Sequence, residues 1–262
     1  MPTFELTGAQ REFFATFGFL HLPGLFAEES TRIEDAFEEV IRSRGGDGHD
    51  GRKRLSVAPF LNHSEYLCSL LDDERLDGIA RAFCGDDYQY WNSDGNYYVG
   101  DTPWHSDGTL SNPVGFVKLA LYLDPVDADS GALRVIPGSH REGELYAEMI
   151  DEQIRGERFW GGLPGDRVPA VALASRPGDL VLFNQALKHS AWGGGTRRRM
   201  FTINYTCAIT PAVLERYREV VASHGYSKAD VFGDPPGPLL TGAPARRLDH
   251  LSALREHIPD AA

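Results

Sequence analysis

The side chains best placed to do chemistry in this sequence are His105 and Asp107, in the segment Trp104–Gly108. If this segment is an extended strand, both side chains leave the same face with Cα atoms roughly 6.5–7 Å apart, so an imidazole and a carboxylate can reach one cation. A third donor, His189, lies much later, shortly after the apolar run 180–183. Two histidines and one carboxylate form the facial triad that holds Fe(II) and leaves one side open for further ligands and dioxygen. We therefore expect His105, Asp107 and His189 to be both metal ligands and catalytic residues.

The same three residues also have a plainer interpretation, because a surface histidine near an aspartate is common. The set contains no thiolate, which argues against structural zinc. The remaining histidines are interpreted as ordinary surface or core residues: His21, His49, His63, His140, His224, His250 and His257. Three further features of the sequence favour the metal site.

The first feature is a run of three arginines, Arg197 to Arg199, which leads into an apolar segment at 200–205. A basic run usually covers a solvated surface, but alternation along a strand sends Arg198 to one face and its two neighbours to the other. One guanidinium is therefore positioned to enter the interior, where it keeps its charge and presents a planar fork that matches a carboxylate. We expect its partner to be a dicarboxylate cosubstrate that chelates the metal at its other end.

The second feature is Lys118, a charge in the middle of the strand predicted at 116–123. This lysine can snorkel or protect a sheet edge, or it can bind an anion inside the fold, and the sequence leaves both interpretations open. The third feature is the segment 130–140, which ends a strand in a tight turn at Pro137 and Gly138 and is interpreted as structural.

The elements that must position these residues begin at about residue 87, where β-branched and aromatic runs alternate with Gly, Pro, Asn and Asp, as is typical of antiparallel strands. Strands are predicted near 87–92, 95–100, 116–123, 132–136, 168–173, 179–184 and 198–207. Their spacing favours a sandwich or jelly roll over alternating βαβ units. The long excursion at 139–167 and the loop 44–60 are predicted to close over a site.

The first third of the chain is predicted to be mainly helical. Thr7 and Gln10 have capping-box spacing at the start of a short helix that Gly18 ends. Apolar spacing predicts a second helix at 28–43 and further helices within 64–84, separated by a loop at 49–60. We interpret 1–262 as a single domain, with a helical part at about 1–85, a jelly-roll core at about 86–208, and a tail of helices and loops at 209–262 that begins with a helix at 211–223.

The composition excludes several classes of protein. The 262 residues carry a formal net charge of −12, so the chain lacks the basic surface of a nucleic-acid binder or of a protein that docks on anionic membranes. An apolar content of 42% can bury a sizeable core, which excludes disorder as a description of the whole chain. The N-terminus has no apolar stretch of the signal-peptide kind, and no apolar run approaches the roughly 18 residues of a membrane span. Three scattered cysteines favour a reducing compartment. We expect a cytoplasmic monomer or homodimer that acts on a small molecule.

Taken together, these motifs resemble the phytanoyl-CoA dioxygenase (PhyH) family of Fe(II)- and 2-oxoglutarate-dependent oxygenases, over about residues 5–208. The segments that carry the likeness are Gly18-Phe19, Pro23–Phe26, Trp104–Asp107, Gly131–His140, Pro177–Asp179 and His189. The resemblance implies a mainly β fold with flanking helices and a cupin-like double-stranded β-helix (jelly roll) at its core, with iron on the three predicted ligands. It also implies that 2-oxoglutarate binds iron through its C1 carboxylate and keto oxygen, and binds an arginine after the second histidine through its far carboxylate.

The resemblance also implies which residues bind the cosubstrate. Counting back from Tyr205, as relatives are spaced, selects Arg198, although a short interval from His189 keeps Arg199 as an alternative. In some relatives the residue three before the first ligand histidine lines the cosubstrate pocket, and here that residue is Thr102. Lys118 is grouped with Arg198 and Thr102 as cofactor-binding.

The activity implied is hydroxylation of an unactivated C–H bond of a small molecule, with release of succinate and CO2. Halogenases of this fold replace the ligand carboxylate with a small residue, whereas this chain keeps Asp107, which favours hydroxylation. The alternatives are a cupin-like isomerase or lyase that does not use 2-oxoglutarate, and a non-catalytic jelly roll that binds small molecules. The sequence does not identify the substrate; the candidates for lining its pocket are Arg52, Lys53, Arg54, Asn96, Tyr98 and Trp160.

Overall fold

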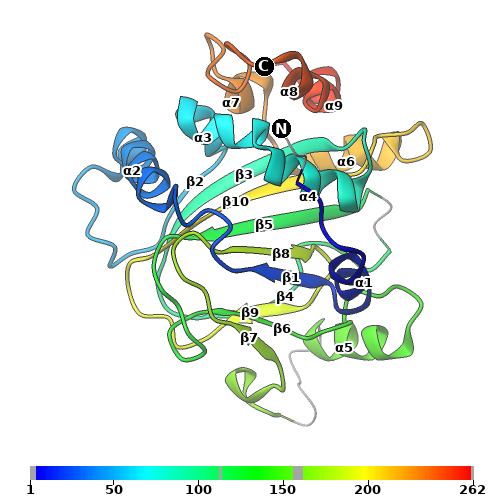
Figure 1. Cartoon of the computed structure of the whole chain (residues 1–262). Helices are drawn as coiled ribbons and strands as arrows, with labels where there is room; N and C mark the ends of the chain where they lie inside the picture. Colours follow the sequence, from blue (N-terminus) through cyan, green and yellow to red (C-terminus); the bar gives the residue numbers. More distant parts are fainter. Residues whose placement is uncertain (1–3, 112–113, 156–161, 261–262) are drawn as a thin grey trace.

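The computed structural model describes residues 4–111, 114–155 and 162–260, and two antiparallel sheets lie at its centre (Figure 1). The larger sheet has the order β1 (Phe19–Leu22), β8 (Leu180–Asn184), β5 (Phe116–Tyr122), β10 (Arg198–Thr206), β3 (Gln89–Tyr98) and β2 (Leu55–Val57). The smaller sheet has the order β4 (Thr102–His105), β9 (His189–Ala191), β6 (Leu133–Val135) and β7 (Val171–Leu173). Between β3 and β10 the chain passes back and forth between the sheets, and this is the double-stranded β-helix of a jelly roll. The predicted fold class is confirmed.

Helices cover the outer face of the larger sheet (Figure 1). The N-terminal helices are α1 (Gly8–Phe17), α2 (Ser30–Ile41), α3 (Glu65–Ser69) and α4 (Glu74–Cys84), with short turns of helix at Arg42–Gly46, Leu61–His63 and Leu70–Asp72. The C-terminal helices are α6 (Leu214–His224), α7 (Lys228–Phe232), α8 (Ala245–Asp249) and α9 (Ser252–His257). No helix within the described ranges is long and apolar enough to cross a membrane.

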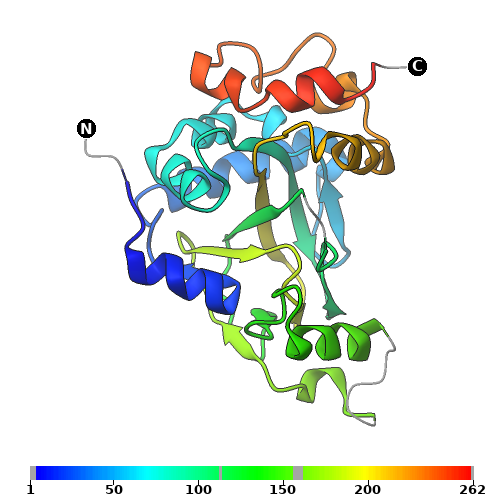
Figure 2. The same ribbon diagram turned by 90° about the vertical axis from the view of Figure 1, so that its right-hand side faces the viewer.

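The excursion between β6 and β7 carries α5 (Leu145–Arg155) and a short helical turn at Gly165–Arg167, on the opposite side of the molecule from the C-terminal helices (Figure 2). Ile150 of α5 packs with Trp104 and Ile136 against the smaller sheet. This excursion is described here only for 139–155 and 162–167, and Trp160 lies outside the described residues. The predicted excursion between strands is present, but α5 within it was not predicted, because its inward apolar positions, such as Ala147 and Ile150, are few.

The side chains divide into two main apolar layers. One layer lies between the helices and the outer face of the larger sheet and includes Phe37, Phe60 and Phe201. The other lies between the two sheets and includes Leu133, Val181 and Met200. Because neighbours along a strand point to opposite faces, the strands of the larger sheet other than β2 contribute side chains to both layers.

The predicted boundaries differ from the structure in three places. The two strands predicted at 87–92 and 95–100 are one continuous strand, β3, because Gly95 has no side chain and the ring of Phe60 lies where a Cβ would be. The strands β1 and β2 belong to the larger sheet although they fall within the expected helical part and the predicted loop at 49–60. The short strands β4 and β9 were not predicted as separate strands, since each is no longer than four residues.

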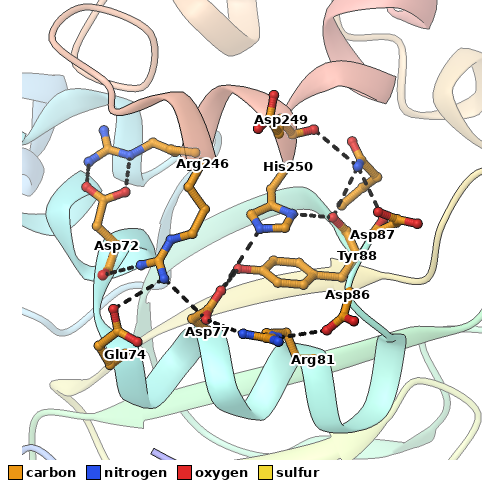
Figure 3. A network of polar contacts seen from close by, with 12 residues as sticks. Asp72, Glu74, Asp77, Arg81, Asp86, Asp87, Tyr88, Arg246, Asp249 and His250 are labelled. Carbon is orange, nitrogen blue, oxygen red and sulfur yellow. Dashed lines mark hydrogen bonds and ion pairs between the residues drawn. The ribbon is translucent and has the colours of Figure 1, made fainter. Parts of the chain in front are cut away.

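The tail is tied to α4 by a network of polar contacts (Figure 3). Arg247 of α8 donates from Nε to Asp72 at 2.9 Å, and its Nη1 donates to the carbonyl of Pro238 at 3.1 Å. Asp77 of α4 accepts a hydrogen bond of 2.9 Å from the hydroxyl of Tyr88 and lies 3.2 Å from Arg246. These contacts fix the C-terminal helices over the sheet.

Candidate metal centre and cosubstrate cavity

The structure brings His105, Asp107 and His189 together between the two sheets. One donor atom from each lies within 4.8 Å of the others, close enough to share one cation. Asp107 Oδ1 is 3.9 Å from His105 Nε2, and Asp107 Oδ2 is 3.6 Å from His189 Nε2. The two histidines meet because they are paired across β4 and β9. Asp107 comes from the loop after β4, where its backbone N–H donates to Gln185 O at 2.9 Å.

Both imidazoles are held in the same tautomer. His105 Nδ1 lies 2.8 Å from the carbonyl of Pro103, and His189 Nδ1 lies 2.8 Å from the carbonyl of Leu187. A carbonyl can only accept, so each Nδ1 carries the proton and each Nε2 keeps its lone pair on the side of Asp107. A backbone acceptor on the second nitrogen is the usual way in which a metal-binding histidine is oriented.

Burial and neighbouring charges set the pKa values of His189, Asp107 and Lys118. Burial lowers the pKa of His189 to about 4, so that its imidazole is neutral at pH 7. Burial acts to raise the pKa of Asp107, but the ammonium of Lys118, 2.8 Å away, together with the two neighbouring imidazoles outweighs it and lowers the pKa to about 2. Burial likewise opposes the charge of Lys118, yet Asp107 raises the pKa of the lysine. The centre therefore offers two imidazole nitrogens and one carboxylate, a donor set that fits Fe(II).

Lys118 does not lie at a sheet edge, because β5 is hydrogen-bonded to β8 on one side and to β10 on the other. The lysine faces the space between the sheets and contacts a predicted metal ligand. Of the two interpretations that the sequence left open, protection of a sheet edge is therefore excluded.

Arg198 enters the same cavity and has few partners. It is 5% exposed, and its guanidinium makes one long hydrogen bond, from Nη2 to Gly100 O at 3.4 Å. Its Nη1 is buried and finds no hydrogen-bond partner among the described residues. The guanidinium fits beside Gly131 and Gly194, where a Cβ would collide with it. A buried charge in this condition needs an anion, because an uncompensated ion in the interior is costly.

Arg199 takes the opposite face of the same strand. Its guanidinium contacts Asp124 at 2.6 Å, Glu38 at 2.7 Å and Glu34 at 2.8 Å, on the outer side of the larger sheet. These three carboxylates satisfy Arg199 without any ligand. Geometry therefore places Arg198, and not Arg199, in the cavity.

A cavity of about 490 Å³ joins the three donors to Arg198, within the range typical of small-molecule sites. Thr102 and Lys118 line it, as do Arg54 and Tyr98 among the candidates for a substrate pocket. Both guanidiniums lie near the ring of Tyr98, at 4.7 Å for Arg54 and 5.3 Å for Arg198.

The other substrate candidates lie elsewhere. Asn96 is buried on the inner face of β3, where its amide donates to Asp94. Arg52 and Lys53 are exposed and are not among the residues that line the cavity.

Several residues of this cavity were not predicted from the sequence. Tyr122 and Met200 line it because they share a face with Lys118 and Arg198 on their strands, a signal that counting by twos would have found. Gly131 and Gly194 were not predicted to flank the guanidinium, since their contact with it depends on the folded path of two loops.

Comparison with known proteins identifies the family to which the chain is similar. A family model described as phytanoyl-CoA dioxygenase (PhyH) matches residues 14–200. A search of curated proteins finds no match. Among solved structures, EctD from S. alaskensis is 23% identical with a TM-score of 0.59, covering 77% of each chain. HygX from Streptomyces hygroscopicus, solved with nickel and 2-oxoglutarate bound, is 20% identical with a TM-score of 0.61, covering 78% of this chain and 88% of HygX. The carbocyclase SnoK from nogalamycin biosynthesis is 22% identical with a TM-score of 0.59, covering 80% of this chain and 90% of SnoK. At these identities the structural matches establish the fold.

Proposed function

The chain belongs to the phytanoyl-CoA dioxygenase family of Fe(II)- and 2-oxoglutarate-dependent oxygenases, and we propose that His105, Asp107 and His189 hold its iron while Arg198 holds the far carboxylate of 2-oxoglutarate. The observation that carries this proposal is the unpaired Nη1 of Arg198 in a cavity that also contains the three donors. A metal site alone does not need a buried guanidinium, but a dicarboxylate that spans the cavity does.

The protein residues prepare the site for this chemistry. Bound together, iron and 2-oxoglutarate supply the oxidising power: O2 is consumed, 2-oxoglutarate becomes succinate and CO2, and a substrate C–H bond is hydroxylated. His105 and His189 offer nitrogen lone pairs on one side of the cavity, and Asp107 adds a carboxylate whose second role is to pair with Lys118. Arg198 orients the cosubstrate through charge-assisted hydrogen bonds, which are strong in a dry cavity.

Lys118 and Thr102 are assigned to the cosubstrate side of the cavity. The ammonium of Lys118 orients Asp107 at 2.8 Å and adds positive charge toward an incoming carboxylate. Thr102 lines the same cavity from β4, where it is paired with Ala191 of β9. The volume of about 490 Å³ supports a small-molecule substrate beside the cosubstrate. The iron-bound EctD and the HygX structure with nickel and 2-oxoglutarate support the choice of metal and cosubstrate.

The test is succinate formation from 2-oxoglutarate by the iron-loaded protein in air, screened over small-molecule classes that include acyl thioesters, amino acids and phosphonates. We expect succinate that depends on both iron and 2-oxoglutarate, and none from Asp107→Ala. Metal binding without any 2-oxoglutarate turnover or binding would instead favour a cupin-like isomerase or lyase. Arg198→Met separates these outcomes, because it impairs only a protein that uses the dicarboxylate.

A further inference from the structure

Lys188 is a buried charge beside the metal centre that the proposed reaction does not use. It precedes His189, and its side chain is only 1% exposed. Burial of an ammonium costs several kcal/mol unless its donors are satisfied. An apolar residue of similar size would fill this position at lower cost, so the partners of Lys188 are informative.

The three donors of this ammonium reach three different segments. Lys188 Nζ lies 2.6 Å from Asp151 Oδ1 of α5, donates to Ser106 Oγ at 3.1 Å, and donates to Ala186 O at 3.2 Å. Ser106 stands between the predicted ligands His105 and Asp107. Its own hydroxyl donates to Gly108 O at 2.8 Å, which fixes the turn that carries Asp107.

The backbone of Lys188 is fixed as well. Its N–H donates to Ser139 Oγ at 2.9 Å, and its carbonyl accepts from the N–H of Ile136 at 3.0 Å. Ser139 is fully buried just after β6. The smaller sheet therefore fixes the backbone of Lys188. Because the backbone is fixed, the ammonium can in turn fix the positions of the groups that it contacts.

We propose that Lys188 is a positioning residue of the metal centre. Its ammonium fixes Ser106, and through Ser106 the turn that aims Asp107 at the two imidazoles. Asp151 neutralises the ammonium and ties α5 to the same point, so that the long excursion between β6 and β7 braces the metal ligands. This inference rests on the proposed metal centre, because the residues being positioned are its ligands.

The experiment measures equilibrium binding of Co(II) to the full-length protein and the visible ligand-field spectrum of the Co(II)-loaded site. The main variant is Lys188→Met with Asp151→Leu, which replaces the buried pair by apolar side chains and so avoids leaving one charge alone. The matched control is Arg247→Met with Asp72→Leu, which removes the partly buried ion pair between α8 and the turn before α4, far from the ligands in sequence. This pair belongs to the polar contacts of Figure 3, called the α4–α8 network below. Ser106→Ala and Ser106→Thr test the hydroxyl directly.

We expect the Lys188/Asp151 double variant to bind Co(II) about 10-fold or more weakly, as partners behind metal ligands typically contribute, and to show an altered spectrum. Ser106→Ala should weaken binding in the same direction, and Ser106→Thr should restore it because it keeps the hydroxyl. The Arg247/Asp72 control should bind like the native protein. A purely structural role for the pair would leave the Co(II) spectrum and the Ser106 variants unchanged.

Native affinity and an unchanged spectrum in both the double variant and Ser106→Ala would overturn the inference. If the double variant does not fold, the comparison of Ser106→Ala with Ser106→Thr decides the question alone. If the native protein itself binds no Co(II), the proposed metal centre fails, and this outcome is distinct from native binding that the variants do not alter.

Discussion

Two buried arginines show how differently this molecule treats its interior charges. Arg247, in the α4–α8 network, is 7% exposed, and Arg198, in the cavity, is 5% exposed. Arg247 donates from Nε to Asp72 at 2.9 Å and from Nη1 to Pro238 O at 3.1 Å, and its Nη2 also contacts the Asp72 carboxylate. Arg198 has one long hydrogen bond to Gly100 and a buried Nη1 with no hydrogen-bond partner among the described residues. The two arginines are similarly buried, but the charge of Arg247 is paired with a carboxylate and the charge of Arg198 is not.

The charged groups around the two arginines differ in the same way. In the network, Asp77 is 3% exposed and is contacted by Tyr88, by Arg246 at 3.2 Å and by Arg81 at 3.7 Å (Figure 3). The positive and negative charges of the network pair with one another within the protein, and these pairs hold the C-terminal tail onto α4. In the cavity the positive charge of Arg198 has no carboxylate partner among the described residues. A buried charge with complete partners indicates a structural contact, and one without them indicates a ligand.

The largest effect is expected in the network. Arg247→Met leaves Asp72, whose side chain is 26% exposed, without its partner and should lower the free energy of unfolding by up to about 3 kcal/mol, the upper range for hydrogen bonds to charged groups. Urea denaturation measures this loss. Metal and 2-oxoglutarate affinities of the folded variant should match the native values, and a large change in either would show that the two regions are not separate.

The pH dependence of stability should be of nearly the same size and should originate in the cavity. His189 has a pKa of about 4 in the metal-free protein against an ordinary 6.5, so the unfolded chain binds the proton more readily between these values. Its contribution, about 3 kcal/mol, is complete above pH 6.5 and is lost as the pH falls toward 4.

Urea denaturation of the metal-free protein at pH 7.5 and pH 4.5 checks this expectation. His189→Gln cannot take up a proton, so its stability should change less over the same range. An equal loss in both proteins would assign the acid sensitivity to other groups.

Arg198→Met should weaken 2-oxoglutarate binding by about 10- to 100-fold, because a charge-assisted hydrogen bond contributes about 1.5–3 kcal/mol. In contrast to Arg247→Met, it should leave the stability of the unliganded protein unchanged or raise it, since it removes a buried charge that lacks a partner. Calorimetric titration of the metal-loaded protein and thermal unfolding give the two values. A marked loss of stability would contradict the proposed difference between the arginines.

The smallest effect on the cosubstrate concerns Arg199, the other candidate from the sequence. Arg199→Met should leave 2-oxoglutarate affinity within about twofold of native, because this guanidinium is satisfied on the outer face by Asp124 and Glu38. Stability should fall by about 1.5–3 kcal/mol, the range of hydrogen bonds to charged groups. The same titration and urea experiments check both values, and a strong effect on 2-oxoglutarate would reverse the assignment of Arg198.

Short sequence patterns correctly predicted the elements that depend on residues close together in the chain. The capping box of Thr7 and Gln10 is present at the start of α1, and Gly18 ends that helix at φ 84°. The strands β5 and β10 lie within one or two residues of their predicted bounds, because alternating apolar positions determine which face of a strand is buried.

Other features depend on contacts between residues far apart in the chain and could not be predicted from the sequence. The residues Asn92 to Gly95 have the composition of a turn, yet pairing with β10 along its length keeps β3 extended there. The two-residue spacing of His105 and Asp107 is visible in the sequence, but the arrival of His189 depends on the pairing of β4 with β9. The contact of Lys188 with Asp151 could not be predicted, because α5 was itself not predicted within the excursion.

Anaerobic titration of the protein with iron and 2-oxoglutarate shows whether the cavity binds both together. We expect a charge-transfer absorption band in the green region for the native protein and for Arg247→Met. We expect the same band only at about 10- to 100-fold higher 2-oxoglutarate for Arg198→Met, and no band for Asp107→Ala. A native protein that stays colourless with saturating iron and 2-oxoglutarate would show that the cavity does not bind them together.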